Sequence, residues 1–144
     1  MITKTAIKRR IDTNRVYQFE EKAQILAPFY RQLALSTLQK LASRIWREEG
    51  YPKPKPLIKF GLGSWSSSRY LSYYHSIEHE IILAEDQRDK ITLIHELVHA
   101  KGRGYHSQAF FADEVYLLAK YCKIDFALLV NEAQQFGLRY VPRQ

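Results

Sequence analysis

Five consecutive residues, His95-Glu96-Leu97-Val98-His99, have the side-chain types that hold a catalytic metal ion. In a helix, residues four positions apart lie one above the other, so the imidazoles of His95 and His99 can reach one ion. Neutral imidazole suits Zn²⁺, and a catalytic zinc site keeps one position open for water. Glu96 would project near that water as a general base, accepting its proton and passing it to a leaving nitrogen. The motif predicts a hydrolytic zinc site, and the alternative is a helix whose polar face carries these three residues by coincidence.

Catalysis requires a third protein ligand, and three residues downstream of the motif can supply it. His106 is the predicted ligand, because it follows His99 by seven residues, after a glycine-containing turn that lets the chain reverse towards the metal. Glu114 is the rival, as in zinc peptidases with a downstream glutamate, and Asp113 is a weaker rival. In the alternative interpretation, His106 has no role at a metal site and is a residue at the start of a helix that faces solvent. The residues alone leave these choices open.

The segment TLIHELVHAKGRGYHSQAF, residues 92–110, resembles the peptidase core of SprT-like proteins and their Spartan and WLM-type relatives. Their pattern is a hydrophobic strand, HExxH, a short loop, and a histidine followed by a small residue and a nearby aromatic. The likeness covers residues 56–121. It implies a minimal zincin fold, in which a small sheet backs the metal helix. It also implies that the zinc ligands are His95, His99 and His106, with Glu96 as general base.

The same resemblance implies a substrate class, since SprT-like relatives often process proteins crosslinked to DNA. Two features depart from the SprT-like pattern. Many SprT-like chains carry a carboxy-terminal zinc ribbon with paired cysteines, whereas this chain has one cysteine, Cys122. The usual His-Gly after the loop is His106-Ser107 here, closer to the WLM-like variants. The resemblance therefore supports the broad superfamily more strongly than a role in DNA repair.

The composition favours one folded domain. The 144 residues fit a single zincin-like metallopeptidase domain over 1–144, and a hydrophobic content of 46% argues against disorder. Cys122 cannot form an internal disulfide and is expected to be a small core residue. The net charge of +7 would attract polyanions, so DNA is a possible partner. No apolar stretch is long enough to span a membrane, and we expect a cytoplasmic protein without membrane contact. The oligomeric state is not predicted.

The order of elements predicts an α+β fold, with helices packed on a small, mostly antiparallel sheet and the HExxH helix behind it. Residues 1–14 are expected to be a basic arm. Residues 16–49 have a helical pattern that Pro28 divides into a short and a long helix, and Gly50 ends it. The proline-rich stretch 51–56 is expected to be a stiff connector.

Strands are predicted in three segments rich in β-branched and aromatic residues, LIKFGLG, SRYLSYYH and HEIILAE. Residues 64–84 are expected to include a hairpin that turns at 75–78. The segment 79–85 is predicted to be the strand nearest the cleft, at an edge where an extended peptide substrate can pair with it. His75 and His79 are interpreted as polar hairpin residues that face water.

The segment 63–74 mixes aromatic residues with Arg69. Such residues could stack on exposed bases, but cross-strand pairs within the sheet are the favoured interpretation. Lys101 and Arg103 could steer an acidic substrate or a phosphate backbone, with solvated loop charges as the alternative. Tyr105 could donate a hydrogen bond to an oxyanion.

Three helices are predicted after residue 85. Asp89 is expected to cap the helix 90–102, a second helix covers about 107–121, and Asp125 caps a last helix that ends at Gly137. We therefore predict a zinc metalloendopeptidase, acting on a protein or peptide substrate. The alternatives are a zinc-containing nucleic-acid-binding module with a structural metal, and a non-catalytic adaptor or toxin-like factor that kept the fold.

Overall fold

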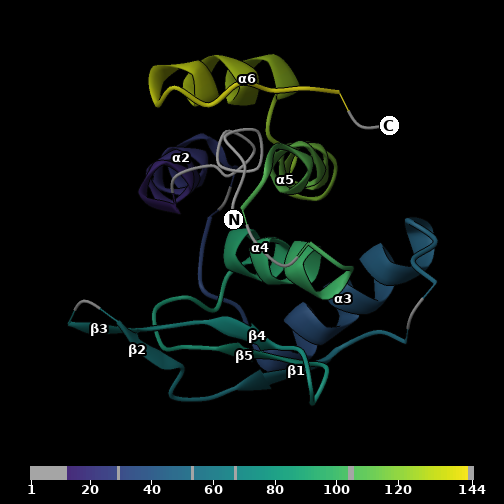
Figure 1. Ribbon diagram of the computed structural model, residues 1–144. Helices are drawn as coiled ribbons and strands as arrows, with labels where there is room; N and C mark the ends of the chain where they lie inside the picture. The colour runs from purple at the N-terminus through teal and green to yellow at the C-terminus, as the bar shows by residue number, and fades with distance from the viewer. Residues whose placement is uncertain (1–12, 29, 53, 67, 104–105, 143–144) are drawn as a thin grey trace, which may run out of the picture. The chain divides into compact units, whose positions relative to one another are not determined.

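A computed structural model describes residues 13–28, 30–52, 54–66, 68–103 and 106–142. Among these residues it contains five helices and five strands, so the predicted α+β class is confirmed (Figure 1). In chain order they are α2 (Thr13–Leu26), α3 (Leu35–Glu48), β1 (Leu57–Phe60), β2 (Ser64–Ser66), β3 (Arg69–Leu71), β4 (Tyr73–His75), β5 (Glu80–Leu83), α4 (Lys90–Ala100), α5 (Gln108–Tyr121) and α6 (Phe126–Gln135).

The chain divides into two compact units. We call residues 30–102 the sheet unit, and residues 1–29 with 103–144 the helical unit. Compact units of this size can belong to one domain, so the single domain over 1–144 stays a prediction. Most of the expected arm, 1–14, lies outside the described residues. Its last two residues begin α2 and are therefore helical.

A three-stranded sheet in the order β1-β5-β4 forms the base of the sheet unit. β5 pairs with β1 in parallel and with β4 in antiparallel orientation. The expected hairpin is confirmed, because β4 and β5 are joined by a turn at 76–79. The prediction that 79–85 forms an edge is wrong: β5 is the central strand, since β1 covers its other side, and β4 is the edge strand.

A second hairpin, β2–β3, pairs Trp65 with Tyr70 across the strands. The two rings meet edge to face with centroids 4.9 Å apart, which confirms the cross-strand interpretation of these aromatics. Ser72 separates β3 from β4. Its hydroxyl accepts a hydrogen bond from the Ala84 amide at 2.8 Å, and its own amide donates to Gln87 at 2.6 Å. These bonds explain why the predicted strand segment 68–75 is interrupted at Ser72.

Helices α3 and α4 lie on the same face of the sheet (Figure 1). α4 contacts β4 and β5, as predicted for the HExxH helix, and α3 contacts β1. The core beneath them consists of fully buried aliphatic side chains, among them Leu38, Ile45, Ile58, Ile81, Leu83, Leu93, Ile94 and Leu97.

The long helix starts at Leu35, not near Pro28 as expected. Residues 32 and 33, before α3, are hydrogen-bonded to the loop that precedes α4. The Leu33 amide donates to the Arg88 carbonyl at 2.8 Å, and the Gln32 side chain accepts from the Arg88 amide at 2.8 Å. These bonds replace the helical bonds that the residues would otherwise make. Gly50, with φ of +67°, ends α3 as predicted.

In the helical unit, α2, α5 and α6 bury a shared core. Phe19 of α2 meets Phe111 of α5 edge to face at 5.2 Å. Asp125 caps α6 by accepting a hydrogen bond from the Leu128 amide at 3.0 Å, as predicted. Cys122 is buried, which confirms its interpretation as a small core residue.

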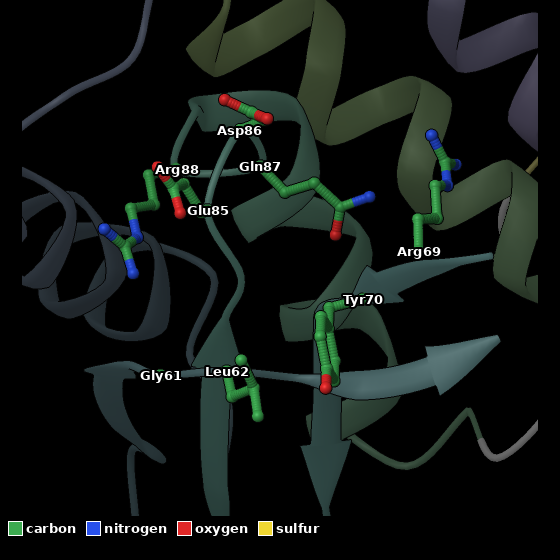
Figure 2. Close-up of a pocket in the computed structure, with 8 residues that line it drawn as sticks. All are labelled: Gly61, Leu62, Arg69, Tyr70, Glu85, Asp86, Gln87 and Arg88. Atoms are coloured by element: carbon green, nitrogen blue, oxygen red, sulfur yellow. The ribbon is translucent and has the colours of Figure 1, made fainter.

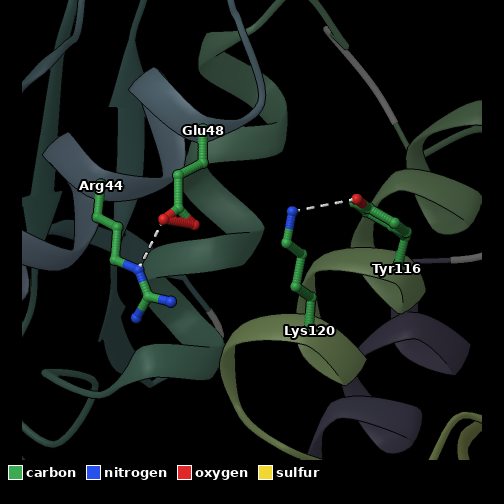
Figure 3. A network of polar contacts seen from close by, with 4 residues as sticks. All are labelled: Arg44, Glu48, Tyr116 and Lys120. Atoms are coloured by element: carbon green, nitrogen blue, oxygen red, sulfur yellow. Dashed lines mark hydrogen bonds and ion pairs between the residues drawn. The ribbon is translucent and has the colours of Figure 1, made fainter.

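Exposed faces of the helices carry ordinary polar pairs (Figure 3). In α3, Arg44 and Glu48 form an ion pair of 3.0 Å, and in α5 the Lys120 ammonium donates to the Tyr116 hydroxyl at 3.4 Å. Each pair joins residues four apart, a spacing that contributes about 0.2–0.5 kcal/mol. None of the described helices combines the length and apolar character needed to cross a bilayer.

Candidate metal centre

The histidine pair of the motif lies on α4. The rings of His95 and His99 are 5.0 Å apart between centroids, inclined at 68°. Each offers a ligand nitrogen, and the two lie within 4.8 Å of each other. His95 is 3% exposed and His99 is half-buried. Two imidazoles in this arrangement suit a borderline-soft divalent ion such as zinc.

Glu96, one position after His95, is 5% exposed. A carboxylate is rarely buried to this degree, because desolvation of its charge costs free energy unless a partner compensates it. Apart from His95, the other buried residues of α4 are aliphatic. A buried carboxylate in an otherwise mostly apolar helix therefore needs a functional or structural reason. Glu96 is adjacent in sequence to one of the two histidines that could hold a metal.

Both ends of α4 are fixed close to the motif. At its start, Asp89 accepts hydrogen bonds from the Thr92 amide at 2.9 Å and the Thr92 hydroxyl at 3.0 Å, which confirms the predicted cap. Burial raises the pKa of Asp89, although these bonds favour its charged form and oppose the rise. At its end, Gly102 has φ of +127° and its amide donates to the His99 carbonyl at 3.0 Å. The helix thus ends at Ala100, one residue beyond the second histidine.

Two other predicted polar residues of the sheet unit make structural contacts. His79 uses both ring nitrogens: Nδ1 meets the Tyr74 hydroxyl at 2.6 Å, and Nε2 contacts the Pro54 carbonyl. Because a carbonyl only accepts, Nε2 carries the proton and Nδ1 accepts from Tyr74. His79 therefore ties the proline-rich connector to the hairpin instead of facing water. The Lys101 ammonium lies 5.0 Å from the centroid of the Tyr51 ring, a cation–π contact.

His106 belongs to the helical unit. It precedes Ser107, whose hydroxyl caps α5 by accepting from the Phe110 amide at 3.1 Å. The half-buried imidazole of His106 packs edge to face on two aromatic rings. Its centroid lies 6.2 Å from the centroid of the Tyr17 ring and 4.8 Å from that of the Phe110 ring. Helices α2 and α5 therefore both orient this ring. Since His95 and His99 belong to the sheet unit, the joining of His106 to them stays a prediction.

The two rival ligands differ in their surroundings. Asp113 is 4% exposed in its side chain and accepts from the Arg103 guanidinium at 3.1 Å, so both charges are already paired. Because Arg103 is paired with Asp113, it is less suited to attract an acidic substrate or a phosphate backbone. Glu114 is fully buried, and one of its carboxylate oxygens lies within 4.8 Å of a carboxylate oxygen of Glu20.

Glu20, 8% exposed, is a buried acid that the sequence motifs did not single out. A signal for it exists, because Glu20 occupies the apolar stripe of α2 together with Val16, Phe19 and Ala23. Two carboxylates this close repel each other when both are ionised, so a proton or a cation stabilises the pair. Tyr105, the residue considered for an oxyanion contact, lies outside the described residues.

Among the described residues, His75 and His79 join no cluster of three metal-ligating side chains. The sheet unit thus holds a histidine pair next to a buried glutamate, and the helical unit holds a separately oriented histidine. The chain matches no protein-family model, no curated protein and no solved structure.

Proposed function

We propose that this protein is a zinc-dependent metallopeptidase of SprT-like character, with a minimal zincin fold, that acts in the cytoplasm. The observation that carries the proposal is the pairing of His95 and His99 on one face of α4 with a buried acid, Glu96, between them in sequence. A structural metal site has no use for that acid, whereas a hydrolytic site needs it as a base.

His106 is the third ligand in this proposal. It follows Gly102 by only four residues, which span at most about 13–14 Å when fully extended. This short spacing along the chain supports His106 as the third ligand. Its ring is already oriented by Tyr17 and Phe110, so little side-chain entropy is lost when it binds an ion. Asp113 is a poorer ligand because Arg103 holds its carboxylate.

The chemistry follows from the position of the buried acid. Zinc, when bound by the three imidazoles, would polarise a scissile carbonyl and acidify a water molecule. The Glu96 carboxylate accepts a proton from the water that attacks the carbonyl carbon. It then delivers this proton to the amine nitrogen as the carbon–nitrogen bond breaks, so that an acid and an amine leave and the carboxylate is restored.

The edge strand β4 favours a polypeptide as the substrate. β4 pairs with β5 on one side, and no described strand pairs with its other side. The strand contacts α4, the helix that carries the histidine pair. An extended peptide can add to such an edge through main-chain hydrogen bonds, with little dependence on sequence.

The net charge of +7 is compatible with substrates among DNA-associated proteins, because a basic chain is attracted to the phosphate backbone. DNA contact belongs to the proposal only in this supporting role, since the hydrolytic site does not require it.

The test combines metal analysis of the purified protein with hydrolysis of unfolded casein. We expect one zinc ion per chain and slow, broad cleavage. Glu96→Gln should keep the zinc and lose activity by about 10²–10⁴-fold. Glu78→Gln, a matched change of an exposed acid in the turn after β4, should retain both zinc and activity.

Zinc retained with cleavage unaffected in Glu96→Gln would refute the role of this residue. X-ray absorption of the zinc protein separates the enzyme from the nucleic-acid-binding alternative. Three nitrogens with one exchangeable water support the enzyme. A fourth protein ligand without water supports a structural metal.

A further inference from the structure

A pocket of the sheet unit opens beside the β2–β3 hairpin, where β1 and β5 end (Figure 2). It encloses about 520 Å³, and its lining includes Leu62, Arg69, Tyr70, Glu85, Asp86 and Arg88. The pocket is formed by residues outside α4, so it is separate from the histidine pair.

Apolar side chains at this pocket are unusually exposed. Leu62 is 68% exposed, Trp65 is 63% exposed and Tyr70 is 39% exposed. Leu62 and Tyr70 line the pocket, and Trp65 packs edge to face on Tyr70. Leu62, just before β2, and the two hairpin residues Trp65 and Tyr70 form an exposed apolar patch of the kind that marks binding surfaces. We call Leu62, Trp65 and Tyr70 the hairpin patch.

The charges around the patch have both signs. The Arg88 guanidinium is held 4.2 Å from the centroid of the Phe60 ring, and its Nε donates to the Leu83 carbonyl at 3.4 Å. Arg69 is exposed and forms no ion pair with the described residues. Glu85 and Asp86 are exposed on the same lining. Two carboxylates would repel the phosphates of a nucleic acid, whereas a polypeptide presents apolar, polar and charged groups together.

The hairpin is continuous with the edge that we propose for substrate pairing. β3 ends one residue before β4, and Ser72 between them is anchored by its two hydrogen bonds. A peptide that pairs antiparallel with β4 runs towards β3 on its own carboxyl side. Tyr70 is three residues before the start of β4, a span of about 10 Å in an extended chain.

We propose that the hairpin patch, with Arg69 and Arg88 beside it, binds an apolar side chain of an extended polypeptide, on the carboxyl side of the segment paired with β4. The identity of this polypeptide as substrate rests on the proposed function. The binding does not, because it requires neither metal nor hydrolysis.

Tryptophan fluorescence gives a direct test. The chain has two tryptophans, and Trp46 is 6% exposed, so Trp65 reports on the patch. The experiment uses the full chain with Glu96→Gln, to prevent cleavage. The probe is a synthetic unfolded peptide with leucine and phenylalanine side chains and no tryptophan. Its counterpart has serine at those positions, and oligothymidylate represents a nucleic acid.

We expect the apolar peptide to change the Trp65 emission saturably, and the serine peptide and oligothymidylate to leave it unchanged. Leu62→Ser and Tyr70→Ser should each weaken peptide binding by about tenfold. Ile77→Ser, in the turn between β4 and β5 and 88% exposed, is the matched control and should bind normally. Circular dichroism checks that each variant is folded.

Three results would overturn the proposal: a response to oligothymidylate alone, no response to any probe, or equal weakening in Ile77→Ser. Failure of the proposed function has a different signature, since the peptide would still bind while the chain with Glu96 intact cleaves nothing. Conversely, if cleavage occurs with an unchanged KM in Tyr70→Ser, the metallopeptidase stands and the hairpin site falls.

Discussion

The hydroxyl of Tyr30 donates a hydrogen bond to Oδ2 of Asp89 at 3.2 Å, although the two residues are 59 positions apart in the chain. Asp89 is the N-cap of α4, and Tyr30 is the first residue of the sheet unit. The bond therefore joins the beginning of the unit to the beginning of the helix that carries the histidine pair.

Replacement of Tyr30 by Phe should lower the free energy of unfolding by about 1 kcal/mol, the usual net value of one hydrogen bond. Burial, and then the charge of Asp89, raises the pKa of Tyr30 to about 12. The folded state therefore holds this proton more tightly than the unfolded state, whose pKa is about 10. The resulting stability is complete below about pH 10 and is lost as the pH rises through about 12. Urea unfolding of wild type and Tyr30→Phe over this range should show the steeper fall in wild type.

Changes at Asp89 should separate its hydrogen bonds from its charge. Asp89→Ala loses the cap and should destabilise the protein by about 0.5–2 kcal/mol. Asp89→Asn keeps an oxygen for the Thr92 amide. Since burial raises the folded pKa of Asp89, wild-type stability should fall as the pH rises from about 4 towards the raised pKa. Asp89→Asn should flatten this fall in denaturant titrations, and a pH dependence equal to that of wild type would contradict the prediction.

Two glycines with positive φ should respond differently to alanine. Gly50, at φ +67°, has no atom within 4 Å of the position that an alanine methyl would take, so Gly50→Ala should cost only the backbone strain of about 1–2 kcal/mol. Gly63, at φ +89°, would place the methyl carbon 2.6 Å from the Leu71 carbonyl oxygen. Gly63→Ala should therefore cost about 1–3 kcal/mol more, from overpacking. Urea unfolding measures both, and equal costs would contradict the clash.

Asp113→Asn should distinguish a structural ion pair from a metal ligand. The change removes the charge that Arg103 meets at 3.1 Å, and because Arg103 is 42% exposed we expect a modest loss of about 1 kcal/mol. Zinc content should remain at one ion per chain, whereas His106→Ala should lose most of it. Zinc loss in Asp113→Asn with zinc retained in His106→Ala would reverse the assignment of the third ligand.

Removal of zinc by a chelator should lower the melting temperature. An ion present at about 100 times its dissociation constant stabilises a folded protein by about 2.7 kcal/mol. His99→Ala should melt at the same temperature with and without chelator, and His75→Ala should keep the wild-type response. Differential scanning calorimetry with matched zinc concentrations measures the shift.

The helix boundaries that depend on local chemistry were predictable from the sequence. The caps at Asp89 and Asp125 and the stop at Gly50 each depend on a side chain or a positive φ within a few residues. The helix that carries His95 and His99 was also predictable, and so was its burial, since an apolar helix with a polar motif must be buried on most of its surface.

Features that depend on distant partners were not predictable. Strands β4 and β5 have similar compositions, so composition does not show which of them lies at the edge of the sheet. β5 is central because β1 pairs with its other side. Helix α3 starts later than predicted because residues 32 and 33 form hydrogen bonds with Arg88 in the loop before α4. Glu20 was missed because its significance depends on Glu114, which lies far along the chain. In each case a long-range contact overrides the local pattern.

The two compact units also differ in how the chain builds them. The sheet unit is one continuous stretch, 30–102, but the helical unit is split around it. During synthesis, at about 5–20 residues per second, α2 leaves the ribosome several seconds before α5. Until then the apolar residues Val16, Phe19 and Ala23 lack the cover that α5 and α6 give them among the described helices. The apolar face of nascent α2 therefore stays uncovered while the whole sheet unit is synthesised, and slower translation of residues 30–102 would prolong this exposure.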